Sequence, residues 1–232
     1  MFWCENPRDV LQVRGPDAAS YLQSQLSQDI RPLQVGQSTW SFLLQPTGRI
    51  EVLLRLWRTS DDTFVLDTDE GFGDVLVARL NRFKIRVKAD IETLEWRCIA
   101  VRGAGAGPDG SVVGWGSGYD LLGATPTAPA DVAAGTPHDL LVERIDAAWP
   151  QMGVEIVPGE TIPAETGITD RAVSFTKGCY PGQELVERMD SRAVTAPRVL
   201  QRVTAVHAAA IGARITSTAG DIVLAFVPRS AL

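Results

Sequence analysis

The segment 175–189, FTKGCYPGQELVERM, places a thiol, an ammonium group and a phenol beside a Pro-Gly turn. Pro181 and Gly182 fit the two central positions of a type II turn. The apolar residues after the turn are spaced as in a helix. Cys179 is therefore expected just before a helix start, where free N–H groups and the helix dipole favour a thiolate. Lys177 adds a positive charge nearby, and both Cys179 and Lys177 are candidate catalytic residues.

This setting suggests three kinds of chemistry for Cys179: a nucleophile, a redox thiol or a transient ligand for a metal–sulfur group. The plainer alternative stays open, because a lone cysteine is more often a small buried apolar residue. A lone lysine such as Lys177 is likewise usually a solvated surface charge. Cys98, in WRCIAV, is expected in a buried strand, and Cys4 has no predicted role.

A second candidate is Glu165, in the segment IPAETG before the turn. The two oxygens of a carboxylate match two N–H donors that lie in one plane, as on an amino-pyrimidine ring. A carboxylate that caps a helix or faces water is the alternative. Glu165 is therefore a candidate for binding a flat heterocycle.

Composition excludes several classes of protein. The chain of 232 residues is 45% hydrophobic and carries a net charge of -6, which fits a globular protein and argues against nucleic acid as the main partner. Three cysteines without a CxxC pair argue against a disulfide framework, and two distant histidines give a metal site no support. No apolar run is long enough for a membrane span, and no secretory signal is visible. We therefore expect a cytoplasmic protein.

Common catalytic motifs are also missing from the sequence. It has no GxSxG, HExxH or Walker loop, and GAGAG at 103–107 lacks the spacing of a dinucleotide loop.

Periodicity predicts the elements that must position these side chains. Helices are expected at 16–26, at 72–80, at 136–149 with a Thr136–Asp139 capping box, and after the turn at 181–182. Strands are expected at 40–44 and 50–56 as a hairpin, and at 63–68, 84–92 and 95–103. Residues 103–137 should be loop-rich with one or two short strands, and a small β-unit should end the chain. This mixture predicts an α+β fold with antiparallel pairing.

The octapeptide KGCYPGQE resembles the K-G-C-Y-x-G-Q-E signature of YgfZ-type folate-binding proteins, and all seven fixed positions match. These proteins are relatives of the glycine-cleavage T-protein, an aminomethyltransferase, and are linked to the assembly or repair of iron–sulfur proteins. GPDAASYLQSQLSQDI, LLQPTGRIEVLLRLWR, LNRFKIRVKADIE and IPAETG are also similar to family segments. The likeness covers roughly residues 10–203.

The resemblance implies the T-protein fold, in which intertwined α/β subdomains surround a central channel for tetrahydrofolate and a small β-barrel follows. It implies that Glu165 holds the pterin ring and that the Lys177, Cys179 and Tyr180 corner lines the channel near the folate. The other residues expected to contact the folate are Gly182, Gln183, Glu184, Gln28 and Asp29.

Two departures from the family pattern affect the C-terminal part. Arg192 precedes Ala193, where the family usually has an R-G pair, and only 29 residues follow Val203. We therefore expect a folate-binding region at 1–200 and a truncated β-barrel-like unit at 201–232, and whether this short unit closes a barrel is left open.

A third departure concerns catalysis. The T-protein's catalytic aspartate lies in a hairpin stretch that matches GRIEVL here, which places Val52 and Leu53 at the two acidic positions. Glu51 is adjacent but points to the opposite face of a strand. Aminomethyl transfer needs a carboxylate to orient the amine, so whether the chain is an enzyme is left open.

The motifs and the resemblance together support three hypotheses about function. The first is a tetrahydrofolate-binding protein that supports iron–sulfur proteins, with those client proteins as partners. The second is a folate-dependent aminomethyltransferase or demethylase. The third is an interaction module that binds no ligand.

Overall fold

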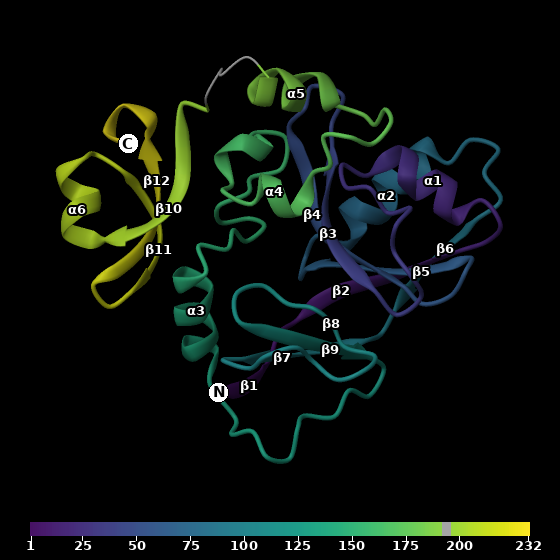
Figure 1. Cartoon of the computed structure of the whole chain (residues 1–232), viewed down its shortest axis with the longest axis horizontal. Coiled ribbons are helices and arrows are strands. Elements are labelled where there is room, and N and C mark those ends of the chain that lie inside the picture. The colour runs from purple at the N-terminus through teal and green to yellow at the C-terminus, as the bar shows by residue number, and fades with distance from the viewer. Residues whose placement is uncertain (192–195) are drawn as a thin grey trace.

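The computed structural model describes residues 1–191 and 196–232. Arg192 and Ala193, noted in the sequence for the missing glycine, lie outside the described residues. The described chain forms three antiparallel sheets (Figure 1). The largest has the order β3-β4-β5-β2-β6, with bounds Ser38–Leu44, Ile50–Arg58, Thr63–Asp69, Arg8–Arg14 and Asp90–Leu94.

The second sheet is intertwined with the first. Its order is β1-β7-β9-β8, with bounds Phe2–Glu5, Arg97–Arg102, Gly118–Gly123 and Val112–Val113. The chain enters this sheet with β1, passes directly to β2 in the first sheet, and returns from β6 to β7. Two short connections, residues 6–7 and 95–96, therefore join the two sheets.

The five-stranded sheet is covered on both faces at β3, β4 and β5, whereas its edge strand β6 is largely exposed. One face packs against α1 (Ala18–Gln25) and α2 (Gly73–Phe83) through a cluster centred on Leu22, Leu54 and Leu80. The other face packs against the segment 149–156, α4 (Thr169–Ala172) and the start of α5 (Gln183–Ser191). This explains why residues 52–56 of β4 are all buried, Arg55 included.

The helix α3 (Pro137–Asp146) lies between the N-terminal sheets and the C-terminal part (Figure 1). Its predicted capping box is confirmed: the Asp139 N–H donates to the Thr136 hydroxyl, and the Asp139 carboxylate accepts from the Thr136 N–H at 2.8 Å. Such a box satisfies backbone donors that a helix start leaves free. It fixes where the helix begins.

The third sheet is small, with the order β10-β12-β11 at Arg198–Thr204, Ile222–Pro228 and Arg214–Ala219. The helices α6 (Ala205–Ala210) and η2 (Arg229–Ala231) complete this part, and η1 (Pro163–Glu165) lies upstream. The expected short C-terminal β-unit is confirmed, and its three described strands close no barrel. The division at residue 200 stays a prediction, and that boundary falls inside β10.

One predicted strand is wrong in its extent. Residues 84–89 do not join the sheet, because β6 begins at Asp90. Ile85 is 76% exposed and Arg86 has a φ of 58°, so the chain turns there although its side chains alternate. Alternation over a few residues is satisfied equally well by an exposed loop.

Among residues 1–191 and 196–232, no helix combines the length and apolarity of a membrane span. The same residues contain no group of three or more His, Cys, Asp or Glu side chains arranged to hold a metal ion.

Candidate functional site

A cavity with a volume of about 600 Å³ lies between β1, α3 and the segment after α3. Its polar residues include Asp69, Arg144 and Gln151, and its aromatic walls are Trp3, Trp115 and Trp149. A mostly apolar cavity of this size with a few convergent polar groups is typical of a small-molecule site.

The tryptophan walls are held by their neighbours. Trp149 packs against Trp40 with the ring centroids 4.7 Å apart. Trp115 lies against the guanidinium of Arg102, 4.0 Å from the ring centroid. Rings fixed in this way can contact a flat heterocycle at little entropic cost.

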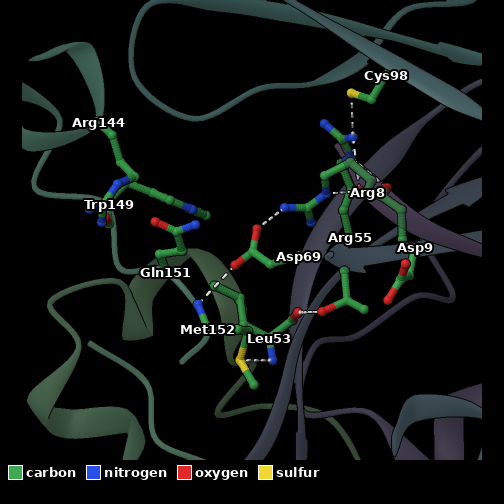
Figure 2. Close-up of polar contacts among 12 residues, drawn as sticks. Arg8, Asp9, Leu53, Arg55, Asp69, Cys98, Arg144, Trp149, Gln151 and Met152 are labelled. Carbon is green, nitrogen blue, oxygen red and sulfur yellow. Dashed lines mark hydrogen bonds and ion pairs between the residues drawn. The ribbon is translucent and has the colours of Figure 1, made fainter. Parts of the chain in front are cut away.

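Two carboxylates line the cavity, Glu5 and Asp69. Glu5 forms an ion pair with Arg97, so Asp69 is the candidate acceptor for a ligand. It ends β5, and its side chain forms an ion pair with Arg8 from the neighbouring strand β2. It also accepts a hydrogen bond of 2.8 Å from the Met152 N–H. Figure 2 shows Asp69 between Arg8 on one side and the Trp149–Met152 segment on the other. The side chain keeps 19% of its surface exposed, so the carboxylate is still open to a ligand.

Gln151 enters the cavity from a loop that is tightly fixed. Arg144 donates to the Trp149 carbonyl at 3.0 Å and to Glu155 at 2.8 Å, and both side chains are buried. Glu155 also accepts from the Gln151 N–H at 3.0 Å. The Gln151 side-chain amide, with its NH₂ donors and its carbonyl acceptor, therefore starts from a fixed backbone.

The structure places Glu165 outside this set of lining residues. It ends η1, is 5% exposed and accepts from Arg198 Nε at 2.9 Å. Arg198 begins β10, so the pair joins the C-terminal sheet to the loop before the turn. A role in pterin binding at Glu165 stays a prediction.

Lys177 is directed at the first helix. Its ammonium donates to the carbonyls of Gln23 (2.6 Å), Leu26 and Gln28 (3.1 Å). These carbonyls lie in and just beyond the last turn of α1, where they lack helical partners. Burial lowers the pKa of Lys177 to about 8. In this geometry Lys177 caps a helix.

Most of the remaining signature also makes local contacts. Tyr180 is 7% exposed in the core beside α4, and burial raises its pKa to about 12. The Tyr180 N–H donates to Gln183 Oε1 at 3.0 Å. Glu184 and Cys179 are exposed. The signature thus builds a folded turn that leaves the thiol of Cys179 open to solvent.

Gln28 and Asp29 lie in the loop after α1. Gln28 donates to the Arg171 carbonyl at 3.0 Å. Hydrogen bonds from Arg31 lower the pKa of Asp29 to about 2. Neither residue lines the large cavity.

The two positions that match the T-protein's acidic pair are buried and apolar. Val52 is fully buried against the α1–α2 side of the sheet, and Leu53 is 2% exposed on the other side. Glu51 is paired with Arg79 at 3.0 Å.

Sequence reasoning missed Asp69, Gln151 and the tryptophans. Trp3 and Gln151 are 148 positions apart, and no local pattern joins them. One signal was available: TFVLDTD ends in acidic residues that interrupt a buried strand, and a buried carboxylate requires a partner.

Comparison with known proteins agrees with the fold. The family model GCVT N-terminal domain matches residues 9–108. The crystal structure of glycine cleavage system aminomethyltransferase T from Bartonella henselae aligns with a TM-score of 0.72 at 17% identity, covering 98% of this chain and 78% of that one. The intertwined α+β architecture is therefore that of the T-protein.

Curated relatives are similar over most of this chain. An uncharacterized protein of Haemophilus influenzae is 29% identical, covering 79% of this chain and 66% of its own length. The iron-sulfur cluster assembly factor IBA57 homolog of Neurospora crassa is 24% identical, covering 83% and 51%. The tRNA-modifying protein YgfZ of Vibrio vulnificus is 26% identical, covering 84% and 67%. The chain spans about half to two thirds of the length of these relatives.

Proposed function

We propose that this chain, a YgfZ-type protein of the glycine-cleavage T-protein superfamily, binds a reduced folate and supports the assembly or repair of iron–sulfur proteins. The relatives' names support the second half of this proposal, since one is an iron-sulfur cluster assembly factor. The first half rests on the tryptophan-lined cavity of about 600 Å³. That cavity is the single observation that carries the proposal.

The residues in the cavity fit a reduced folate. A pterin ring is flat, and it presents adjacent N–H donors and a carbonyl oxygen at one edge. Asp69 can accept from those donors, and the Gln151 amide can donate to the carbonyl. Trp3, Trp115 and Trp149 supply apolar walls. A bound reduced folate would supply a carrier for one-carbon units.

Aminomethyl transfer is not the function that we propose. The buried apolar side chains of Val52 and Leu53 leave no carboxylate at the positions that match the T-protein's acidic pair. A carboxylate would be needed there to orient the amine.

Titration with folinic acid, a stable reduced folate, tests the binding half. The cavity is lined by three of the chain's six tryptophans, so we expect saturable fluorescence quenching and a matching calorimetric isotherm. Gln151→Ala should weaken binding about tenfold, the worth of one lost hydrogen bond. Glu187→Gln, an exposed change in α5, is the control. No saturable heat would overturn the proposal in favour of an interaction module.

A further inference from the structure

Six charged side chains, five of them buried, form one continuous network that begins in the cavity wall. In the order of their contacts they alternate in sign: Asp69, Arg8, Asp67, Arg55, Asp120 and Arg102. The Asp67 carboxylate lies 2.7 Å from Arg8 Nε and 2.9 Å from Arg55 Nε, so it links these two arginines. The Asp120 carboxylate lies 2.6 Å from Arg55 Nη1 and 2.7 Å from Arg102 Nη1, so it links these two arginines. The network thereby connects the two intertwined sheets.

Both ends of the network reach the cavity. At one end, Asp69 is itself a lining residue. At the other, Arg102 lies under the ring of Trp115, which also lines the cavity. The side chains of Arg55 and Arg102 are 0% exposed, that of Arg8 is 4% exposed, and that of Asp69 is 19% exposed. Of the six, Asp69 is the member that a ligand can touch.

The charges of the network balance at three positive and three negative. A buried charge that loses its partner is costly, so the ionised form of Asp69 is the one that completes the balance. Arg8 Nη1 and the Met152 N–H approach different oxygens of Asp69. This arrangement fixes the carboxylate plane from both sides. A ligand group that meets Asp69 must therefore donate hydrogen bonds.

We infer that Arg8 is a positioning residue, which holds Asp69 as an ionised acceptor so that the cavity selects rings with adjacent N–H donors. This inference rests on the proposed function, because it concerns specificity in the same cavity. The fork of Arg8 reaches two carboxylates at once, Asp67 through Nε and Asp69 through Nη1. A lysine ammonium is a point charge without that planar fork.

The test compares pterin with lumazine as competitors of bound folinic acid. Lumazine carries a carbonyl oxygen where pterin has its 2-amino group, so it loses one donor and presents an acceptor to Asp69. We expect wild-type protein to prefer pterin at least about tenfold, because a buried acceptor left unpaired is costly. Arg8→Lys should reduce this ratio to about twofold or less.

Arg55→Lys is the matched control. Arg55 belongs to the same network and is equally buried, but its carboxylate partners are Asp67 and Asp120 rather than Asp69. Both lysine variants should lower the melting temperature, whereas only Arg8→Lys should change the pterin-to-lumazine ratio. If Arg8→Lys does not fold, Asp69→Asn provides the second variant. Its amide can donate to the lumazine carbonyl, so the preference should shift toward lumazine.

The outcomes separate the inference from the proposed function. Folinic acid that fails to bind wild-type protein overturns both. If folinic acid binds but the pterin-to-lumazine ratio is unchanged in Arg8→Lys, the role of Arg8 alone is overturned. The same holds if Arg55→Lys reduces this ratio equally. A ratio lost only when Arg8 or Asp69 is changed supports it.

Discussion

Gly182 of the signature packs directly against Gly48 of the β3–β4 hairpin. A β-carbon on Gly182 would lie 2.9 Å from Gly48 Cα and 2.4 Å from the Gln45 carbonyl oxygen. Both glycines have positive φ, 82° and 81°. The contact joins the turn before α5 to the largest sheet, so the glycine of the signature is needed for close approach of two backbones.

Gly182→Ala should therefore destabilise the protein. The strained φ and the close backbone contacts together should lower the free energy of unfolding by about 2–4 kcal/mol. Gly178→Ala is the matched control from the same octapeptide, since a β-carbon there meets nothing within 4 Å. Urea unfolding measures both. Equal stability of the two variants would contradict this account of Gly182.

Lys177→Met should destabilise the protein by about 3 kcal/mol, because the ammonium satisfies three backbone carbonyls near the end of α1. Lys88→Met, at an exposed lysine, should change stability by less than about 0.5 kcal/mol. Chemical denaturation followed by circular dichroism compares the two. A Lys177→Met protein as stable as wild type would return Lys177 to the group of ligand-binding candidates.

Alkaline stability should depend on Tyr180. Burial raises its pKa from 10.0 to about 12, so the folded state disfavours the ionised phenol. As the pH rises, this tyrosine therefore ionises at a lower pH in the unfolded chain than in the folded protein. Its contribution to stability is therefore complete below pH 10 and is lost as the pH rises to about 12. Tyr180→Phe should make the fall in melting temperature across that range less steep. An identical slope in both proteins would show that Tyr180 ionises as freely in the folded state.

The sequence predicted those features whose determinants are local. The capping box needs only Thr136 and Asp139, three positions apart, and the structure has it as expected. The hairpin around Gly48 and the turn at Gly182 were likewise visible as short patterns. The strand predicted at 84–92 fails over 84–89 for the same reason, because alternation is local whereas strand pairing requires a distant partner.

The candidate site was less predictable. The signature contains reactive side chains. Nothing in its spacing shows that the Lys177 ammonium donates hydrogen bonds to carbonyls at the end of α1, about 150 positions earlier. The cavity is assembled from β1, β5 and the segment after α3, none of which carries a motif. Asp69 becomes a candidate only once the sheet places it beside Arg8 and Met152.

The two candidate carboxylates can be separated by experiment. Asp69→Asn should weaken folinic acid binding about tenfold or more, because it replaces a carboxylate acceptor in the cavity wall by an amide. Glu165→Gln should leave the affinity within about twofold and should lower stability by about 1 kcal/mol through the pair with Arg198. Isothermal calorimetry gives the affinities. The reverse pattern would place the pterin at Glu165, as the family resemblance implies.

Cys179 should matter for function and not for folding. Its side chain is exposed on the signature turn, so Cys179→Ser should change the free energy of unfolding by less than about 0.5 kcal/mol. The same variant should fail to restore iron–sulfur enzyme activity in cells that lack the protein, if the thiol contacts client proteins or their clusters. Cys98→Ser is the opposite control, because Cys98 is 1% exposed in the core and burial raises its pKa to about 12. That variant should lose stability. Full rescue by Cys179→Ser would remove the thiol from the proposed function and leave folate binding as its remaining basis.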